Sequence, residues 1–290
     1  MEAGFRSKKL QELCFAIVGM GLMGGSYAKA LRKLQVKKII AVERDEAVLA
    51  DVLSQGLADV GLSHPGAALG EADIIICAVY PEAVVNFIAA GVKFFKADVL
   101  LTDVSGIKKN IIARGQALLA PGMEFISGHP MAGREGRGLG MSDASIFRNA
   151  NYIIVPESHN SPEAVRWLEN FAKVLGCAHT VRVTPAEHDR TIAYTSNLPH
   201  VAAVSLVNSV SYSDKTKYFV AGSYRDGTRV ADINPELWCT LFLANKECVA
   251  DEIEKYMEQL ALWRDALRAG DGEKLKAMMR RSRSRRRELF

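Results

Sequence analysis

The sequence predicts an α/β domain in the N-terminal part of the chain and an all-α domain after it. Two observations support this fold class. Short runs of apolar and β-branched residues alternate with helical patterns through the first part of the chain, which is typical of a parallel sheet with helices on both faces. After Pro185 no strong strand-like run follows. The boundary is therefore expected near Thr184, with domains at 1–183 and 184–290.

The first strands of the α/β domain are expected to be almost continuously apolar, because the strands of a parallel sheet are buried on both faces. They are predicted at Cys14–Val18, Lys38–Val42, Ile74–Val79 and Val99–Asp103. Helices are predicted between them at Met23–Leu34, Glu46–Gln55 and Glu82–Phe94. Later strands are expected at Phe125–Ser127, Tyr152–Val155 and Thr180–Val183, and a helix at Glu163–Leu175 should end at Gly176.

The second domain is expected to contain helices only. A helix is predicted at Pro185–Asn208, with a kink at Pro199 because proline cannot complete the backbone hydrogen-bond pattern. Asn234 and Pro235 are typical N-cap and first residues of a helix. The helix that they open is expected to run to about Arg268.

Composition excludes some classes of protein. The chain has 290 residues, is 49% hydrophobic and has a formal net charge of +4, which is too modest to indicate a nucleic-acid binder. Five scattered cysteines without a secretion signal favour a cytoplasmic protein with reduced thiols. No apolar stretch approaches the roughly 20 residues of a membrane span.

The strongest motif is a GxGxxG pattern at residues 19–24, between a predicted strand and a predicted helix. Gly19 permits a tight turn, Gly21 lets the backbone approach a pyrophosphate, and Gly24 lets the helix pack on the strand. Leu22 and Met23 complete the start of the helix, whose N–H groups favour a phosphate. The pattern indicates a Rossmann-type dinucleotide-binding domain; a glycine turn without a cofactor is the alternative.

The second predicted strand ends at an acid, Glu43, which is expected to accept hydrogen bonds from the adenosine ribose. Because a carboxylate repels a 2′-phosphate, NAD is predicted as the cofactor. Arg44 leaves NADP open, since it could hold that phosphate. Val79, Pro81 and Asp103 follow or close other strands and are expected to line the same crevice at the carboxyl edge of the sheet.

The segment from Ser127 to Gly133 places His129 in a loop bounded by glycine and proline. A hydride transfer from a carbinol needs a group that takes the hydroxyl proton, and neutral histidine suits this role because its pKa lies near working pH. The alternative is a loop histidine that caps a backbone carbonyl.

A second polar cluster contains Glu187, His188 and Asp189, followed by the run from Ser196 to His200. The two histidines lie twelve residues apart, so on one helix they fall on roughly one face. Surface polarity of a helix is the favoured interpretation on this evidence alone. No metal site is predicted, because the sequence has no HExxH motif and no cysteine partner.

A third polar segment, Ala221–Arg229, is expected to be a loop between helices. It carries Arg225 and Arg229, and a guanidinium group matches a carboxylate in bidentate fashion. An anionic substrate is one interpretation, and a solvated loop with an internal arginine–aspartate pair is the other.

Taken together, these motifs resemble the prephenate/arogenate dehydrogenases of tyrosine biosynthesis. The resemblance extends from Phe15 to about Leu262 and rests on the order of the GxGxxG, GHPMAG, EHD, LPH and GSYRDGTRVA segments. It implies NAD-dependent oxidative decarboxylation of prephenate to 4-hydroxyphenylpyruvate, with hydride transfer from C4, or the equivalent reaction of arogenate. The sequence leaves prephenate and arogenate open as substrates.

The resemblance also implies roles for particular residues. His129 would polarise the C4 hydroxyl and take its proton, Arg229 would bind a substrate carboxylate, and His200 would assist. The further substrate-site residues that it implies are His188, Arg225, Gly222, Trp238 and Glu135. The helical domain would form a homodimer, in which residues near Gly222 and Trp238 reach the partner's site.

Two positions depart from the family pattern. The family often has a glycine and then a serine before the lysine of the fifth-strand loop, whereas this chain has Ser105 and then Gly106. The catalytic serine role is therefore transferred to Ser105. The family motif SHLPH has Asn197 in place of its first histidine.

Other hypotheses remain. One is a 3-hydroxyacid or imine reductase of the same architecture; another is a non-catalytic, NADH-sensing or nucleic-acid-binding regulator. The latter would use the arginine-rich tail, whose members are Arg280, Arg281, Arg283, Arg285, Arg286 and Arg287. A solvated helix end with cations near its C-terminus is the favoured interpretation of the tail, so nucleic-acid binding is not expected.

Overall fold

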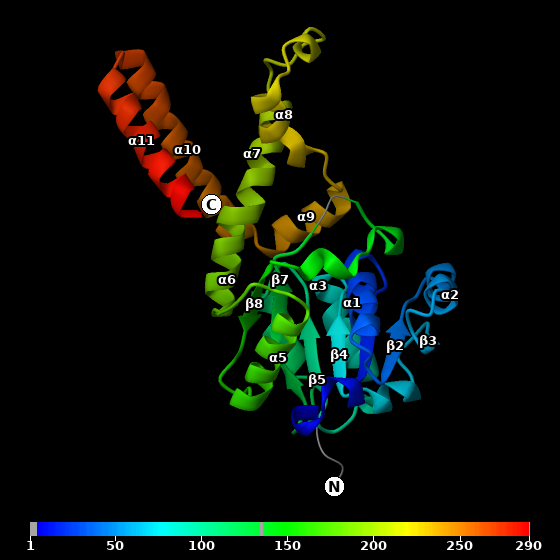
Figure 1. The fold of residues 1–290 in the computed structure, drawn as a ribbon. Coiled ribbons are helices and arrows are strands. Elements are labelled where there is room, and N and C mark those ends of the chain that lie inside the picture. The colour runs from blue at the N-terminus through cyan, green and yellow to red at the C-terminus, as the bar shows by residue number, and fades with distance from the viewer. Residues whose placement is uncertain (1–4, 134–135, 290) are drawn as a thin grey trace. The chain divides into compact units, whose positions relative to one another are not determined.

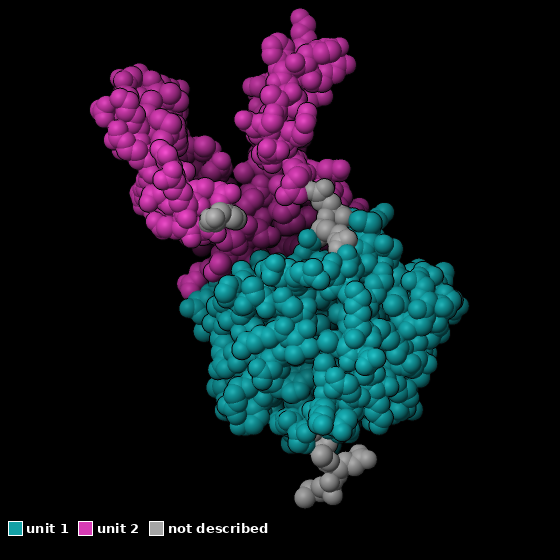
Figure 2. All heavy atoms as spheres, viewed as in Figure 1, with its two compact units in different colours: residues 1–189 teal, residues 190–290 magenta. Residues whose placement is uncertain are grey.

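The computed structural model describes residues 5–133 and 136–289. Its internal contacts divide the chain into two compact units, Met1–Asp189 and Arg190–Phe290 (Figure 2). The sequence placed the boundary a few residues earlier, at 183/184, and these domain limits stay a prediction. The first unit is α/β and the second is helical (Figure 1), so the predicted fold class is confirmed.

The first unit is built on a parallel six-stranded sheet with the order β3-β2-β1-β4-β5-β6. This is the strand order of the doubly wound dinucleotide-binding fold, in which ligands bind where the order reverses, between β1 and β4. The strands are β1 (Cys14–Val18), β2 (Lys38–Val42), β3 (Val60–Leu62), β4 (Ile74–Cys77), β5 (Leu100–Asp103) and β6 (Glu124–Phe125).

Helices cover both faces of this sheet. They are α1 (Leu22–Lys33), α2 (Glu46–Ser54), α3 (Pro81–Gly91), α4 (Lys109–Gln116) and α5 (Pro162–Val174). Successive residues of β1 point to opposite faces: Phe15 packs in the cluster with residues of α1 and α5, and Ala16 in the cluster with residues of α3 and α4. This double burial explains why the central strands β1 and β4 contain only apolar residues.

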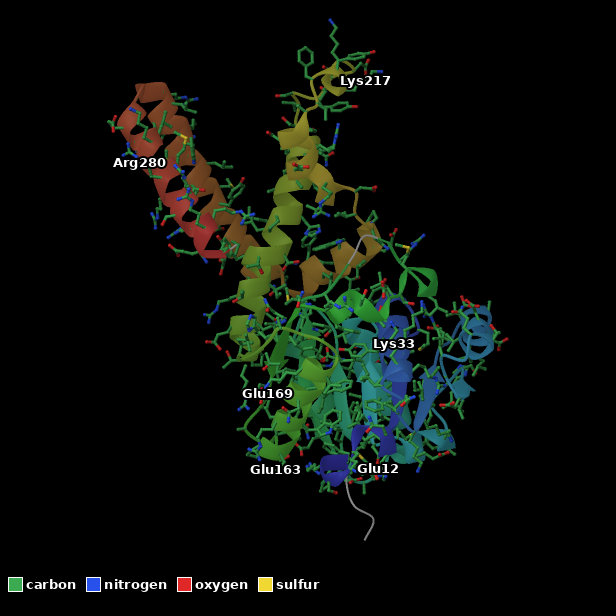
Figure 3. The ribbon with its side chains drawn as sticks, in the orientation of Figure 1. Glu12, Lys33, Glu163, Glu169, Lys217 and Arg280 are labelled. Atoms are coloured by element: carbon green, nitrogen blue, oxygen red, sulfur yellow. The ribbon has the colours of Figure 1, made fainter. Side chains whose placement is uncertain are left out.

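A second sheet has the order β7-β8-β9, with β7 (Ser127–Pro130), β8 (Asn151–Val155) and β9 (His179–Arg182). β7 is antiparallel to β8, and β9 is parallel to it. The predicted strand at 125–127 was wrong in its limits, because Phe125 ends β6 and Ser127 begins β7 in the other sheet. Glu169 of α5, labelled in Figure 3, forms an ion pair with Arg182 of β9 and ties helix to sheet.

The remaining helices are α6 (Pro185–Ile192), which spans the division between the units, and, in the second unit, α7 (Leu198–Val207), α8 (Gly222–Thr228), α9 (Pro235–Ala244), α10 (Lys246–Ala269) and α11 (Gly272–Leu289). α10 and α11 lie side by side (Figure 1) and are joined through Gly270, whose φ of 67° requires the left-handed conformation that glycine adopts readily. None of the helices in the described part of the chain has the length and apolarity that crossing a membrane requires.

Three expectations for the helical part were wrong in detail. The irregular turn in the helix after Pro185 is a π-helical segment, Ala193–Asn197, which precedes Pro199 and inserts an extra residue. The segment expected as a polar loop is helix α8. The helix that Asn234 caps ends at Ala244, because Asn245 leaves the helical conformation with a φ of −120° and a ψ of 24°.

The arginine-rich tail forms the second half of α11, where Arg280 is labelled in Figure 3. Every described residue from 279 to 289 is exposed. The exposure agrees with a solvated helix end, and the role of the tail stays a prediction. Cations in the last turns are also favoured by the helix dipole.

Candidate active site

The glycine motif forms the turn between β1 and α1 and has the geometry of a phosphate-binding loop. Gly19 has a φ of +84°, and a Cβ there would lie 2.5 Å from Cγ1 of Val79. A Cβ on Gly24 would lie 1.8 Å from the carbonyl oxygen of Gly19, so the helix packs directly on the turn. A Cβ on Gly21, the N-cap of α1, would meet no atom within 4 Å. The open space at Gly21 fits a pyrophosphate against the helix start.

Glu43 follows β2 and lies beside this turn. Its Oε2 accepts a hydrogen bond from the backbone N–H of Met20 at 2.8 Å, and its Oε1 accepts one from Asp45 at 3.1 Å. The glutamate is half-buried and Arg44 is exposed. A carboxylate held next to the glycine turn fits a ribose rather than a 2′-phosphate.

The other predicted cofactor residues lie at the same carboxyl edge of the parallel sheet. Leu22 and Met23 are the first residues of α1, Val79 packs against the turn, and Pro81 is the first residue of α3. The residues thus fit a nicotinamide dinucleotide, and their individual contacts stay predictions.

Asp103, at the end of β5, is fully buried, and its carboxylate is the common partner of several polar groups. Its carboxylate forms an ion pair with Lys108, which is also fully buried, at 3.0 Å. It accepts hydrogen bonds from the backbone N–H and hydroxyl of Ser105 and from the hydroxyl of Ser127. These partners offset the cost of burying the charge. The carboxylate is engaged within the chain, and the predicted cofactor contact of Asp103 stays a prediction.

His129 lies on β7 and not in a loop, so that expectation was wrong. Its Nδ1 lies 2.9 Å from Nε2 of His188, on α6. The Nδ1 of His188 lies 2.7 Å from Oδ1 of Asp189. His188 and Asp189 are each only 2% exposed, so surface polarity was the wrong interpretation for both. The three side chains form a continuous chain of hydrogen bonds inside residues 1–189.

Burial sets the protonation of these histidines. It lowers the pKa of His129 well below the usual value, and the positive charge of Lys108 lowers it further. Burial also lowers the pKa of His188, although the hydrogen bond to Asp189 acts in the opposite direction. Both rings are therefore neutral at neutral pH, which is the state that a proton acceptor needs.

In the second unit, three predicted substrate residues lie together. The ring centroids of His200 and Trp238 are 3.6 Å apart, and Arg229 is close enough to lower the pKa of His200, although burial lowers that pKa more. Nδ1 of His200 lies 2.8 Å from the carbonyl oxygen of Ser196. Because a carbonyl only accepts, Nδ1 carries the hydrogen and Nε2 the lone pair of the neutral ring.

Other residues that the sequence singled out lie on helix α8 or in structural positions. Arg225 is exposed on α8, which Gly222 begins. Asn197, which replaces the first histidine of the family motif, is buried. Its Oδ1 accepts a hydrogen bond from Nδ2 of Asn245 at 3.3 Å, and this bond connects the π-helical turn to the junction of α9 and α10. Glu135 lies outside the described residues.

The sequence did not single out Lys108, which contacts the residue before His129 and also contacts Asp189. Its Nζ donates to the carbonyl of Gly128, next to His129, at 2.6 Å, and its backbone N–H donates to Oδ1 of Asp189 at 2.9 Å. The available signals were its position in the loop after β5, in the same strand-end segment as Asp103, and the family pattern that has a lysine in this loop. A lysine there is more often an exposed residue, so burial could not be read from the sequence.

The strand order, the glycine turn and the acid after β2 define the class: an NAD-dependent dehydrogenase with a Rossmann-type domain. The family model for the prephenate dehydrogenase nucleotide-binding domain matches residues 27–181, and the model for the prephenate dehydrogenase dimerization domain matches residues 184–281. The chain belongs to the prephenate dehydrogenase family. The predicted family and enzyme class are confirmed, and a 3-hydroxyacid or imine reductase and a non-catalytic regulator are no longer favoured.

Individual relatives agree with the family models. The chain is 30% identical over 265 residues to a prephenate dehydrogenase of Bacillus subtilis, covering 89% of this chain and 71% of the relative. It is 30% identical over 267 residues to a cyclohexadienyl dehydrogenase of Zymomonas mobilis, covering 90% of each. Its structure resembles that of prephenate dehydrogenase from A. aeolicus in complex with hydroxyphenyl propionate and NAD⁺, with a TM-score of 0.88, 25% identity and coverage of 98% and 100% of the two chains.

Proposed function

We propose that the chain catalyses NAD-dependent oxidative decarboxylation of prephenate to 4-hydroxyphenylpyruvate. The observation that carries this proposal is the contact of half-buried His129 with buried His188, 2.9 Å apart, in a domain with an open phosphate-binding turn at Gly21. The A. aeolicus structure binds hydroxyphenyl propionate, a phenol with a carboxylate side chain, together with NAD⁺. The proposed product has the phenol and the carboxylate as well, and differs by the keto group of its side chain.

His129 is the proposed proton acceptor. The neutral ring takes the proton of the C4 hydroxyl as the hydride leaves C4; NAD⁺, when bound, supplies the hydride acceptor. The resulting dienone loses the ring carboxylate as CO₂, and its electrons pass through the ring to the C4 oxygen. That oxygen then recovers the proton from the His129 imidazolium, so the step consumes and releases no net proton.

The remaining sequence predictions supply binding roles. Arg229 is proposed to bind a substrate carboxylate, and His200 and Trp238 to contact the substrate. Arg225, Gly222 and Glu135 are proposed as further substrate-binding residues. Ser105 is proposed to assist at the C4 hydroxyl, although its own hydroxyl donates to Asp103 in the structure. The match to a dimerization domain supports a homodimer through the helical part, and the enzyme is proposed to act in the cytoplasm.

Arogenate is the second candidate substrate, and the cyclohexadienyl dehydrogenase of Zymomonas mobilis supports it. Prephenate and arogenate differ only in the keto or amino group of the side chain. The proposed chemistry at C4 is the same for both, so His129 would serve either reaction.

The test is the absorbance at 340 nm of the purified protein with each pairing of NAD⁺ or NADP⁺ with prephenate or arogenate. The proposal predicts turnover with NAD⁺ and prephenate and loss of turnover in His129→Asn. His179→Asn is the matched control, because His179 is exposed on β9. A folded protein that binds NAD⁺ but turns over none of the pairings would contradict the proposal.

A further inference from the structure

The donor and the acceptor of each hydrogen bond between Asp189, His188 and His129 can be assigned, starting from Asp189. Asp189 lies at that end, where its Oδ1 accepts from the backbone N–H of Lys108 and its Oδ2 from that of Lys109, each at 2.9 Å. These are the N–H groups at the start of α4, where a helix favours a negative charge. The carboxylate is thereby held in one orientation as an acceptor toward His188.

The next link fixes His188. A carboxylate only accepts hydrogen bonds, so Nδ1 of His188, 2.7 Å from Oδ1 of Asp189, must carry a hydrogen. The neutral ring has one N–H group, so its Nε2 carries a lone pair. That Nε2 lies 2.9 Å from Nδ1 of His129 and can only accept.

His129 must therefore donate from Nδ1, which leaves the lone pair on its Nε2. The charged and titratable groups that act on this pair of histidines are Lys108, Asp103 and Asp189, together with each histidine on the other. Lys108 also fixes the backbone, because its Nζ donates to the carbonyl of Gly128, the residue before His129. Lys108 therefore contacts both ends of the chain of hydrogen bonds, Asp189 through its backbone and the strand of His129 through its side chain.

We infer that Asp189 and His188 are positioning residues that hold His129 in the tautomer with Nε2 as the proton acceptor. The inference rests on the proposed function for its catalytic consequence. As the hydroxyl proton reaches Nε2 of His129, the imidazolium is stabilised through His188 by the carboxylate of Asp189. Ser-His-Asp triads use a carboxylate beside one histidine in the same way, and in them the aspartate-to-asparagine change lowers kcat about 10⁴-fold.

The test compares Asp189→Asn with Glu163→Gln, a matched carboxylate-to-amide change at an exposed position of α5. The amide that Asp189→Asn introduces can donate to Nδ1 of His188 and reverse the polarity of the chain. The expected result is a loss of kcat of at least about 100-fold with KM and NAD⁺ affinity unchanged. Nitrogen-15 NMR of the histidines should show that the Nδ1–H form of His129 in the starting protein changes to the Nε2–H form.

A second pair of variants covers the case in which Asp189→Asn fails to fold. His188→Gln keeps an acceptor for Nδ1 of His129, whereas His188→Phe removes it. His188→Gln should retain at least about tenfold more kcat than His188→Phe, since only it preserves the hydrogen bond.

Equal activity of His188→Gln and His188→Phe would overturn the inference, and so would a starting protein in which His129 carries its hydrogen on Nε2. The NMR measurement needs no substrate. It therefore tests the tautomer even if the proposed substrates are not turned over, and the two failures can be told apart.

Discussion

The two polar clusters of this chain differ in how far their side chains are exposed to solvent. In residues 1–189, Asp103, Lys108, His188 and Asp189 are buried and bonded to one another. In residues 190–290, His200 and Trp238 are half-buried and Arg229 is exposed. A closed network positions a reacting group in advance, whereas a more exposed cluster can form its contacts with a ligand. We therefore expect changes in the first cluster to lower kcat or stability and changes in the second to raise KM.

The largest effect is expected from Lys108→Met, which leaves the buried carboxylate of Asp103 without its cation. Removing one partner of a buried ion pair costs about 3–5 kcal/mol. The matched control is Lys38→Met, because Lys38 pairs with Glu71 near the surface and such a pair contributes less than about 1 kcal/mol. Urea unfolding measures both. Equal losses of unfolding free energy would show that the network is not a closed structural unit.

Arg229→Ala should act on substrate binding and not on the chemical step. A hydrogen-bonded ion pair with a substrate carboxylate is worth about 1.5–3 kcal/mol, so KM should rise roughly 10- to 100-fold with a smaller change in kcat. Steady-state kinetics with Arg268→Ala, an exposed arginine of α10, as control will measure it. A fall in kcat at unchanged KM would remove the distinction between the two clusters.

The glycine turn offers the same contrast between closed and open positions. Gly24→Ala places a Cβ 1.8 Å from the carbonyl oxygen of Gly19 and should destabilise the fold by at least about 1–3 kcal/mol. Gly21→Ala meets no atom of the chain, so the protein should fold normally and lose NAD⁺ affinity at least about tenfold. Thermal unfolding and calorimetric titration separate the two effects. Normal NAD⁺ affinity in Gly21→Ala would place the pyrophosphate elsewhere.

The smallest effect is expected from Glu43→Gln. The amide oxygen can still accept from Met20, but the negative charge that repels a 2′-phosphate is gone. NADP⁺ affinity should rise and NAD⁺ affinity fall, each by about 1 kcal/mol or roughly fivefold. Glu46→Gln, at an exposed position of α2, is the control in the same binding titrations. An unchanged ratio of NAD⁺ to NADP⁺ affinity would show that Glu43 only accepts hydrogen bonds from the backbone of the turn.

Local patterns predicted most of the α/β unit. The strands at Cys14–Val18 and Lys38–Val42 have the limits expected from the sequence. The first is apolar throughout, and the second is apolar after Lys38. β3 was missed because it has three half-buried residues with no run of apolar side chains. The helix starting at Asn234 was correctly placed by its cap, but its end at Ala244 depends on Asn245, which contacts Asn197 far away in the chain.

The residues of the candidate site could be predicted where they belong to a sequence motif. His129, His188 and Arg229 were found through the family resemblance, and the glycine turn through its context. The hydrogen-bond network that orients His129 was not predicted, because the burial of Lys108 and the contact of Asp189 with α4 arise from tertiary packing. A lysine or an aspartate looks the same in a sequence whether it is solvated or enclosed.

The pH dependence of kcat/KM tests the central claim most directly, namely that neutral His129 accepts the proton. Burial and Lys108 lower the pKa of His129, so the ring should stay neutral, and the enzyme active, until the pH falls through that lowered pKa. The acidic limb of the wild-type profile should therefore lie below about pH 6.5, the usual histidine value. It should be absent in His129→Asn, whose rate should be roughly 10²- to 10⁴-fold lower. An acidic limb that persists unchanged in His129→Asn, or a wild-type rate in that variant, would contradict the account.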